Sequence, residues 1–219
     1  MGTAMRFKAA IFDLDGTLLD SMSIWSNLCH EFLLRHNIDQ DIDLDGKLGV
    51  ISMRNALEYV IKEFSLKISL DEAYTETWQI VEEFYHSKAQ IKPGIKKILD
   101  HLQKNGIPCG VITATETGLV IPALERVGLS GYFKHVFSCS EMQTSKRTPE
   151  VFFSMSRLLG ASPSETVVFE DALYAALTAK NAGYAVAAVH DISEKNPLKL
   201  QQTADWYCKD WRDFSPDIL

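Results

Sequence analysis

The segment Ala9-Ala10-Ile11-Phe12-Asp13-Leu14-Asp15-Gly16-Thr17 is the strongest indication of the fold in this chain. The apolar run from Phe7 to Phe12 is typical of a strand in a parallel sheet, because such a strand is buried on both faces. The run ends in two carboxylates, and Gly16 allows the chain to turn sharply after them. Ligands of parallel sheets bind beyond the carboxyl ends of the strands. We therefore expect Asp13 and Asp15 to carry the chemistry of this protein.

Asp13 and Asp15 point to the same side of the chain, because alternate residues of a strand share a face. Two carboxylates this close repel each other, so one of them must be protonated, paired or bound to a cation. The alternative interpretation is a solvated Asp-x-Asp-Gly turn, or part of a calcium loop. Such a loop needs further oxygen ligands at alternate positions, and Gly16-Thr17-Leu18-Leu19 does not supply them.

The composition is that of an ordinary globular protein of 219 residues, with 46% hydrophobic and 23% charged residues. A chain of this length and composition can form a hydrophobic core that is stable without a disulfide or a structural metal. The net charge of −7 argues against non-specific binding to nucleic acid or anionic membranes. No apolar run approaches the roughly 18 residues of a membrane span, and we see no signal-peptide pattern. The 4 cysteines are scattered, which favours reduced thiols. We expect a cytoplasmic monomer that binds neither nucleic acid nor membrane.

The segment 20–90 has helical patterns and no convincing strand. Apolar residues recur at helical spacing from Ile24 to Leu33 and again from Met53 to Phe64. A third helix is predicted to begin after Ser69, because Ser69 and Glu72 have the spacing of a capping box. We therefore expect residues 20–90 to form an all-helical domain inserted into the rest of the chain.

Strand and helix patterns alternate beyond this insert. The strands are expected at 107–113, 136–139, 166–169, 184–189 and 206–208. This alternation is typical of an α/β fold with a doubly wound parallel sheet, to which the strand before Asp13 adds. We expect residues 1–19 and 91–219 to form this core domain, and the helical insert to cover its active edge as a cap.

Polar residues lie at or beyond the ends of four of the expected strands. Asp13 and Asp15 follow the first strand, and Thr113 ends the strand at 107–113. Lys146 lies in the loop beyond the strand at 136–139, and Glu170-Asp171 follow the strand at 166–169. Taken singly, a threonine at a strand end is usually a helix cap, and a lysine in a loop is usually solvated. The ends of parallel strands meet at one edge of the sheet. Together these residues therefore indicate a phosphate and metal site.

With these motifs the chain resembles the haloacid dehalogenase superfamily, in the branch of phosphatases with a helical cap. It is similar there to beta-phosphoglucomutase and phosphoglycolate phosphatase. Asp13-Leu14-Asp15-Gly16-Thr17-Leu18-Leu19-Asp20-Ser21 matches the first family motif. Thr113 matches the second, Lys146 the third and Glu170-Asp171 the fourth. Pro93-Gly94 matches the point at which the chain returns to the core.

The resemblance implies a phosphatase that acts on a small phosphorylated metabolite through an aspartyl-phosphate intermediate. Asp13 is then expected to attack phosphorus. Asp15 is expected to protonate the leaving alcohol and afterwards to activate water. Thr113 is expected to donate a hydrogen bond to the phosphate, and Lys146 to neutralise charge.

The resemblance also implies further phosphate ligands and a Mg²⁺ cofactor. Backbone amides are expected to donate to the phosphate from Leu14, Asp15 and Ala114. The implied magnesium ligands are oxygens at the ends of two strands: those of Asp13, Asp15, Glu170 and Asp171. Asp15 is expected to bind through its backbone carbonyl, with Glu170 nearby or ligating. Oxygen ligands of this kind suit Mg²⁺.

Three features bear on the alternatives. Trp25 occupies the place of a cap histidine of beta-phosphoglucomutase, which disfavours a phosphosugar mutase as the runner-up function. Asp15 argues against dehalogenation, because the haloacid dehalogenases proper lack this second aspartate. Arg147 follows Lys146 where relatives usually have proline, which opens the question of which cation reaches the site. Lys146 is favoured, because Thr148-Pro149-Glu150 then falls in register with the family motif. A non-catalytic protein that binds a phosphate ligand on the same fold is the third interpretation.

Substrate choice is expected to depend on the cap. The residues predicted to contact the leaving group are Met22, Trp25, Met53 and Arg54. Arg54 could bind a second anionic group of the substrate, or it could be a solvated helix residue.

Overall fold

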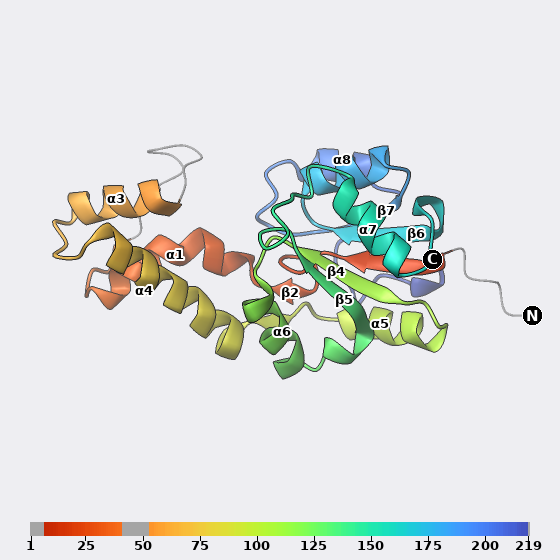
Figure 1. Ribbon diagram of the computed structural model, residues 1–219, viewed down its shortest axis with the longest axis horizontal. Coiled ribbons are helices and arrows are strands. Elements are labelled where there is room, and N and C mark those ends of the chain that lie inside the picture. The colour runs from red at the N-terminus through yellow and green to blue at the C-terminus, as the bar shows by residue number, and fades with distance from the viewer. Residues whose placement is uncertain (1–6, 41–52, 219) are drawn as a thin grey trace, which may run out of the picture. The chain divides into compact units, whose positions relative to one another are not determined.

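The structure is a computed structural model that describes residues 7–40 and 53–218 (Figure 1). The chain divides into two compact units, one formed by Met1–Ser21 with Ala89–Leu219 and the other by Met22–Lys88. The expected boundaries, after residues 19 and 90, fall within a short antiparallel ladder of β2 (Leu19–Asp20) and β3 (Gln90–Ile91). The sequence pattern does not reveal this ladder, because a strand of two residues has no periodicity.

The first unit is built on a parallel sheet that has 6 strands within the described part of the chain. In spatial order these are β5 (Phe133–Ser138), β4 (Cys109–Thr113), β1 (Ala9–Phe12), β6 (Thr166–Glu170), β7 (Ala185–Val189) and β8 (Trp206–Cys208). Every adjacent pair is parallel. The predicted doubly wound α/β core is therefore confirmed, with β1 near the middle of the sheet.

Helices cover both faces of this sheet (Figure 1). One face carries α7 (Glu150–Leu158) and α8 (Leu173–Asn181), and the other carries α5 (Ile95–Lys104) and α6 (Thr117–Arg126). The helix α9 (Pro197–Thr203) contacts α8. Short 3-10 turns are present at Ser130–Tyr132, Pro163–Glu165 and Pro216–Ile218. None of the helices in the described segments is long and apolar enough to cross a bilayer.

Alternate residues of β1 belong to opposite faces of the sheet. Ala9 and Ile11 are part of the core that also holds residues of α7 and α8. Phe12 points the other way and stacks on Phe169, with ring centroids 4.4 Å apart. Every residue of β1 is buried, which explains the unbroken apolar run in the sequence.

The edge strand β5 differs most from its prediction. It begins at Phe133 rather than at residue 136, and it pairs with β4 along its length. Most of its residues are only partly buried. The apolar pattern in the sequence therefore indicates the end of β5 but not its first residues.

The second unit is helical in its described part. It contains α1 (Met22–Arg35), α3 (Met53–Glu63), α4 (Leu70–Glu83) and a π-helical turn at Phe84–Lys88. The predicted capping box of Ser69 and Glu72 is confirmed at the start of α4. The part of the insert from 41 to 52 lies outside the described residues.

The chain leaves β1 through a tight loop that the C-terminal segment holds in place. Gly16 has a φ of 87°, and the amides of Leu18 and Leu19 both donate to the carbonyl of Leu14 at 2.9 Å. The buried indole of Trp211 donates to the carbonyl of Thr17 at 3.0 Å. This loop determines where Asp13 and Asp15 lie at the edge of the sheet.

Candidate active site

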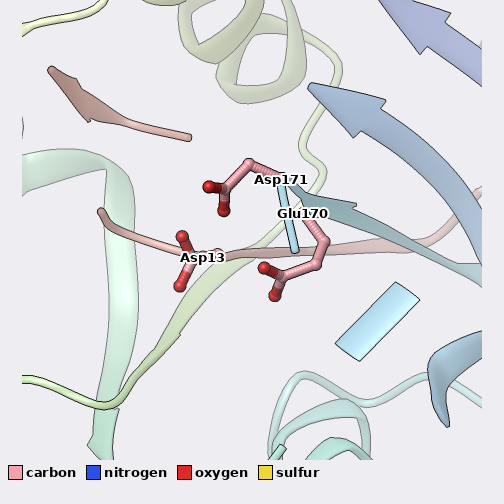
Figure 2. A group of neighbouring side chains, drawn as sticks. All are labelled: Asp13, Glu170 and Asp171. Atoms are coloured by element: carbon pink, nitrogen blue, oxygen red, sulfur yellow. The ribbon is translucent and has the colours of Figure 1, made fainter. Parts of the chain in front are cut away.

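The register of β1 against β6 brings Asp13 next to Glu170. Phe12 pairs with Phe169, so the residues that follow them come together where the two strands end. Asp171 is next in the chain. Carboxylate oxygens of Asp13, Glu170 and Asp171 lie within 4.8 Å of one another, and all three side chains are buried. Figure 2 shows these side chains gathered at the ends of β1 and β6.

Lys146 provides a buried positive charge for this cluster. Its Nζ donates to Oδ1 of Asp13, and it lies 2.8 Å from Oε2 of Glu170. Only 5% of its side chain is exposed. The neighbouring Arg147 is exposed and instead stacks its guanidinium over the ring of Tyr174, 4.3 Å from the centroid. Lys146 is therefore the cation of this loop that contacts the carboxylates.

The charges of the cluster are unbalanced, with three carboxyl groups around one ammonium group. Burial raises the pKa of Asp13 to about 7, against the influence of Lys146 and together with that of Glu170 and Asp15. Burial also raises the pKa of Asp171, and the charges of Asp13 and Glu170 add to this effect. Burial by itself lowers the pKa of Lys146, but these same two carboxylates hold it well above its usual value. An additional cation would relieve the repulsion.

The hydrogen-bond partners of the carboxylate oxygens indicate whether the cluster can bind a metal ion. Oδ2 of Asp13 is buried and has no hydrogen-bond partner among the described residues. Glu170 accepts from the amide of Ala172 at 3.1 Å, and Asp171 accepts from the hydroxyl of Thr17 at 3.4 Å. A buried oxygen left without a donor, beside two other carboxylates, is typical of a ligand to a hard cation. The residues present therefore fit a divalent metal ion.

Asp15 lies outside this carboxylate cluster and is surrounded by hydroxyl groups. Its Oδ1 accepts from Ser21 at 2.6 Å, and its Oδ2 accepts from Thr115 at 2.7 Å. Thr113 is buried at the end of β4, and its hydroxyl is 3.4 Å from the same Oδ2. The structure thus brings Asp15 and Thr113 together, as their positions after neighbouring strands predict. The contacts of Thr115 and Ser21 with Asp15 were not predicted from the sequence.

Besides Asp15, two further positions are predicted to donate backbone amides to the phosphate, and they lie in the loops after β1 and β4. Leu14 is fully buried directly after Asp13. Ala114 is exposed, and its carbonyl accepts a hydrogen bond from Ser140. Both residues are thus at the edge of the sheet at which the carboxylates gather.

The four predicted specificity residues belong to the second unit. Met22 and Trp25 are part of α1, and Met53 and Arg54 begin α3. The ring of Trp25 lies 6.4 Å from that of Trp78, so it takes part in an aromatic cluster of its own unit.

Arg54 already has partners within this unit. Its guanidinium donates to Asp71, with the longer of the two contacts at 3.3 Å. It also lies over the ring of Tyr74, 5.1 Å from the centroid. A substrate anion would therefore compete with Asp71 for this guanidinium.

Comparison with known proteins identifies the family of this chain. Residues 10–189 match the model of a family described as haloacid dehalogenase-like hydrolase. Hexitol phosphatase A of Escherichia coli is 29% identical over 195 residues, which are 85% of this chain and 84% of that protein. (DL)-glycerol-3-phosphatase 2 of Arabidopsis thaliana is 27% identical over 215 residues, 94% of this chain and 88% of that protein.

A solved structure shares the fold over nearly the whole chain. A protein from Thermotoga maritima, provisionally named beta-phosphoglucomutase, superposes with a TM-score of 0.80. The match covers 96% of this chain and 95% of the other, at 22% sequence identity. At this identity the likeness establishes the fold.

Proposed function

The chain belongs to the haloacid dehalogenase-like hydrolase family, and we propose that it is a magnesium-dependent phosphatase of a small phosphorylated metabolite. The reaction proceeds through an aspartyl-phosphate on Asp13. The observation that supports this most directly is the position of Asp13, which contacts the ammonium of Lys146 and stands beside two further buried carboxylates. Two relatives are named as a hexitol phosphatase and a glycerol-3-phosphatase, and these names support the same reaction class.

In the first step, a carboxylate oxygen of Asp13 attacks the phosphorus atom of the substrate. A bond forms between this oxygen and phosphorus while the bond from phosphorus to the ester oxygen breaks. Asp15 gives its proton to the departing alkoxide, which leaves as the neutral alcohol. The ammonium of Lys146 offsets the negative charge that otherwise keeps a carboxylate away from a phosphate dianion.

In the second step, Asp15 is a carboxylate and takes a proton from water. The oxygen of this water bonds to phosphorus while the bond between phosphorus and the Asp13 oxygen breaks. Inorganic phosphate leaves, and Asp13 is a carboxylate again. Asp15 has then regained its proton. One residue therefore serves both half-reactions, as acid and then as base.

The metal site of this proposal consists of Asp13 and Asp171 through their side chains and Asp15 through its backbone carbonyl, with Glu170 nearby or as a further ligand. When bound, Mg²⁺ supplies positive charge that stabilises the phosphate and reduces the repulsion between the carboxylates. The unpartnered Oδ2 of Asp13 supports this assignment.

The phosphate group is held by donors from two loops in this proposal. Thr113 donates through its hydroxyl, and Leu14, Asp15 and Ala114 donate through their backbone amides. Such amides carry partial positive charge at fixed positions and need no reorganisation during the reaction.

We also propose that residues 22–88 act as a cap that excludes water and contacts the leaving group. Met22, Trp25, Met53 and Arg54 are the proposed specificity residues of this cap. The protein is further proposed to act in a reducing, cytoplasmic compartment. The cysteines Cys29, Cys109, Cys139 and Cys208, all free thiols, support that compartment.

The test is phosphate release from a panel of phosphorylated metabolites, measured with Mg²⁺ and with EDTA. Hexitol phosphates and glycerol 3-phosphate come first, and glucose 1-phosphate and phosphoglycolate extend the panel. The wild type is expected to release phosphate only with Mg²⁺. The variant Asp13→Asn should lose this release and retain its fold by circular dichroism.

Two results would overturn the proposal. Conversion of glucose 1-phosphate to glucose 6-phosphate without net phosphate release would identify a mutase. Magnesium-dependent binding of phosphorylated ligands without any turnover would identify a binding protein.

A further inference from the structure

Thr115 makes the shorter of the two threonine contacts to Asp15. It lies two residues beyond Thr113 in the loop after β4, and 6% of it is exposed. Its hydroxyl donates to Oδ2 of Asp15 at 2.7 Å, whereas the hydroxyl of Thr113 is 3.4 Å from the same oxygen. The backbone amide of Thr115 donates to the hydroxyl of Thr113 at 3.0 Å. This last bond fixes Thr115 relative to β4.

A carboxylate with a hydrogen bond on each oxygen cannot rotate freely about its side-chain bonds. Asp15 has such bonds, from Ser21 on Oδ1 and from Thr115 on Oδ2. Because Thr115 is buried, water is poorly placed to substitute for its hydroxyl. A hydroxyl can also both donate and accept, so the contact does not require one particular proton state of Asp15.

We infer that Thr115 is a positioning residue, whose hydroxyl holds the carboxyl group of Asp15 in the orientation that proton transfer to the leaving group needs. This inference rests on the proposed function. Proton transfer requires a donor and acceptor at hydrogen-bonding distance in the reacting complex. Loss of the hydroxyl should therefore slow the cleavage of substrates whose leaving group needs a proton more than the cleavage of substrates whose leaving group departs without one.

The experiment compares two leaving groups in the full-length protein with Mg²⁺. One substrate is the alkyl phosphate that the wild type hydrolyses fastest, whose alkoxide needs the proton. The other is 4-nitrophenyl phosphate, whose phenolate leaves readily without it. The quantity measured is kcat/KM, because it reports the steps up to departure of the leaving group and excludes hydrolysis of the intermediate.

Thr115→Val keeps the shape of the side chain and removes its hydroxyl, and Thr115→Ser keeps the hydroxyl. In Thr115→Val, kcat/KM for the alkyl phosphate should fall about 10-fold or more, as part of the 10²–10⁴-fold typical of general acid catalysis. For 4-nitrophenyl phosphate it should fall less than about 3-fold. Thr115→Ser should recover most of the loss. Thr115→Ala replaces the valine variant if the latter does not fold.

Equal losses for both substrates would overturn the inference, because they would mean that Thr115 binds the phosphate or supports the fold. Unchanged kcat/KM for both would overturn it as well. Failure of the proposed function gives a different result: the wild type itself would release no phosphate from either substrate.

Discussion

Nζ of Lys146 lies 2.8 Å from Oε2 of Glu170, and at most 5% of either side chain is exposed. Lys146 lies in the loop that follows β5 and Glu170 is the last residue of β6, 24 positions further along the sequence. Removing one partner of a buried ion pair leaves a charge without compensation, which is strongly destabilising. Each residue of the pair is therefore needed to compensate the buried charge of the other.

Replacing Lys146 by methionine should destabilise the metal-free protein by about 3–5 kcal/mol. The remaining carboxylates would be buried without a cation, or would have to take up protons. The measurement is urea unfolding in EDTA. Phosphate release should also fall by about 10²–10³-fold, as expected when a group that stabilises transition-state charge is lost.

The neighbouring Arg147→Met is the matched control for this prediction. Arg147 is exposed and contacts the ring of Tyr174 rather than a carboxylate. Its replacement should change the free energy of unfolding by less than about 1 kcal/mol. Equal effects of the two substitutions would contradict the assignment of Lys146 as the cation of the site.

Magnesium should stabilise the folded protein. At a concentration about 100 times Kd, a ligand that binds only the folded state adds about 2.7 kcal/mol. In a chain of this size that corresponds to a rise in Tm of about 5–10 °C. Asp171→Asn should lose most of this rise, measured by thermal unfolding followed by circular dichroism.

The control for metal binding is Asp210→Asn, which removes an acidic residue that pairs with Arg212 outside the cluster. It should keep the full rise in Tm. If Asp171→Asn responds to Mg²⁺ as the wild type does, the carboxylate cluster is not the metal site.

The metal-free protein should lose stability as the pH rises from 5 to 8. Burial raises the pKa of Asp13 from 3.8 to about 7 in the folded state. Between these values the folded state keeps a proton that the unfolded state has released, so stability falls with increasing pH. A shift of this size corresponds to a loss of about 2–3 kcal/mol between pH 5 and 8. The raised pKa of Asp171 acts in the same direction.

Unfolding free energies measured at several pH values in EDTA test this prediction. Asp13→Asn should flatten the slope, because the substituted amide does not titrate. Saturating Mg²⁺ should flatten it too, since the metal favours the ionised carboxylates. A metal-free wild type that gains stability between pH 5 and 8 would contradict the raised pKa.

Gly94→Ala should be much more destabilising than Gly106→Ala. Both glycines have positive φ values, 93° and 70°. A Cβ on Gly94 would lie 2.5 Å from the backbone nitrogen of Arg212, whereas a Cβ on Gly106 would meet nothing within 4 Å. Backbone strain alone accounts for about 1 kcal/mol. The clash should add about 1–3 kcal/mol. Similar urea midpoints for the two variants would show that the segment around Arg212 moves aside easily.

Local patterns in the sequence were enough to predict several elements of the fold. The unbroken apolar run before Asp13 identified the central strand, because such a strand is buried on both faces. Alternation of strands and helices indicated the doubly wound sheet. The capping box at Ser69 located the start of α4, since its donors and acceptors are three residues apart. The order of polar strand ends identified Asp13, Lys146 and Glu170 as candidates.

Contacts between distant segments of the chain could not be predicted from local patterns. The register of β1 against β6 set Asp13 beside Glu170, and the path of the loop after β5 brought Lys146, rather than Arg147, to both. The contact between Thr115 and Asp15 joins residues 100 positions apart. No local periodicity encodes such a pair. The packing of neighbouring strands fixes it, and it therefore becomes visible only once the chain has folded.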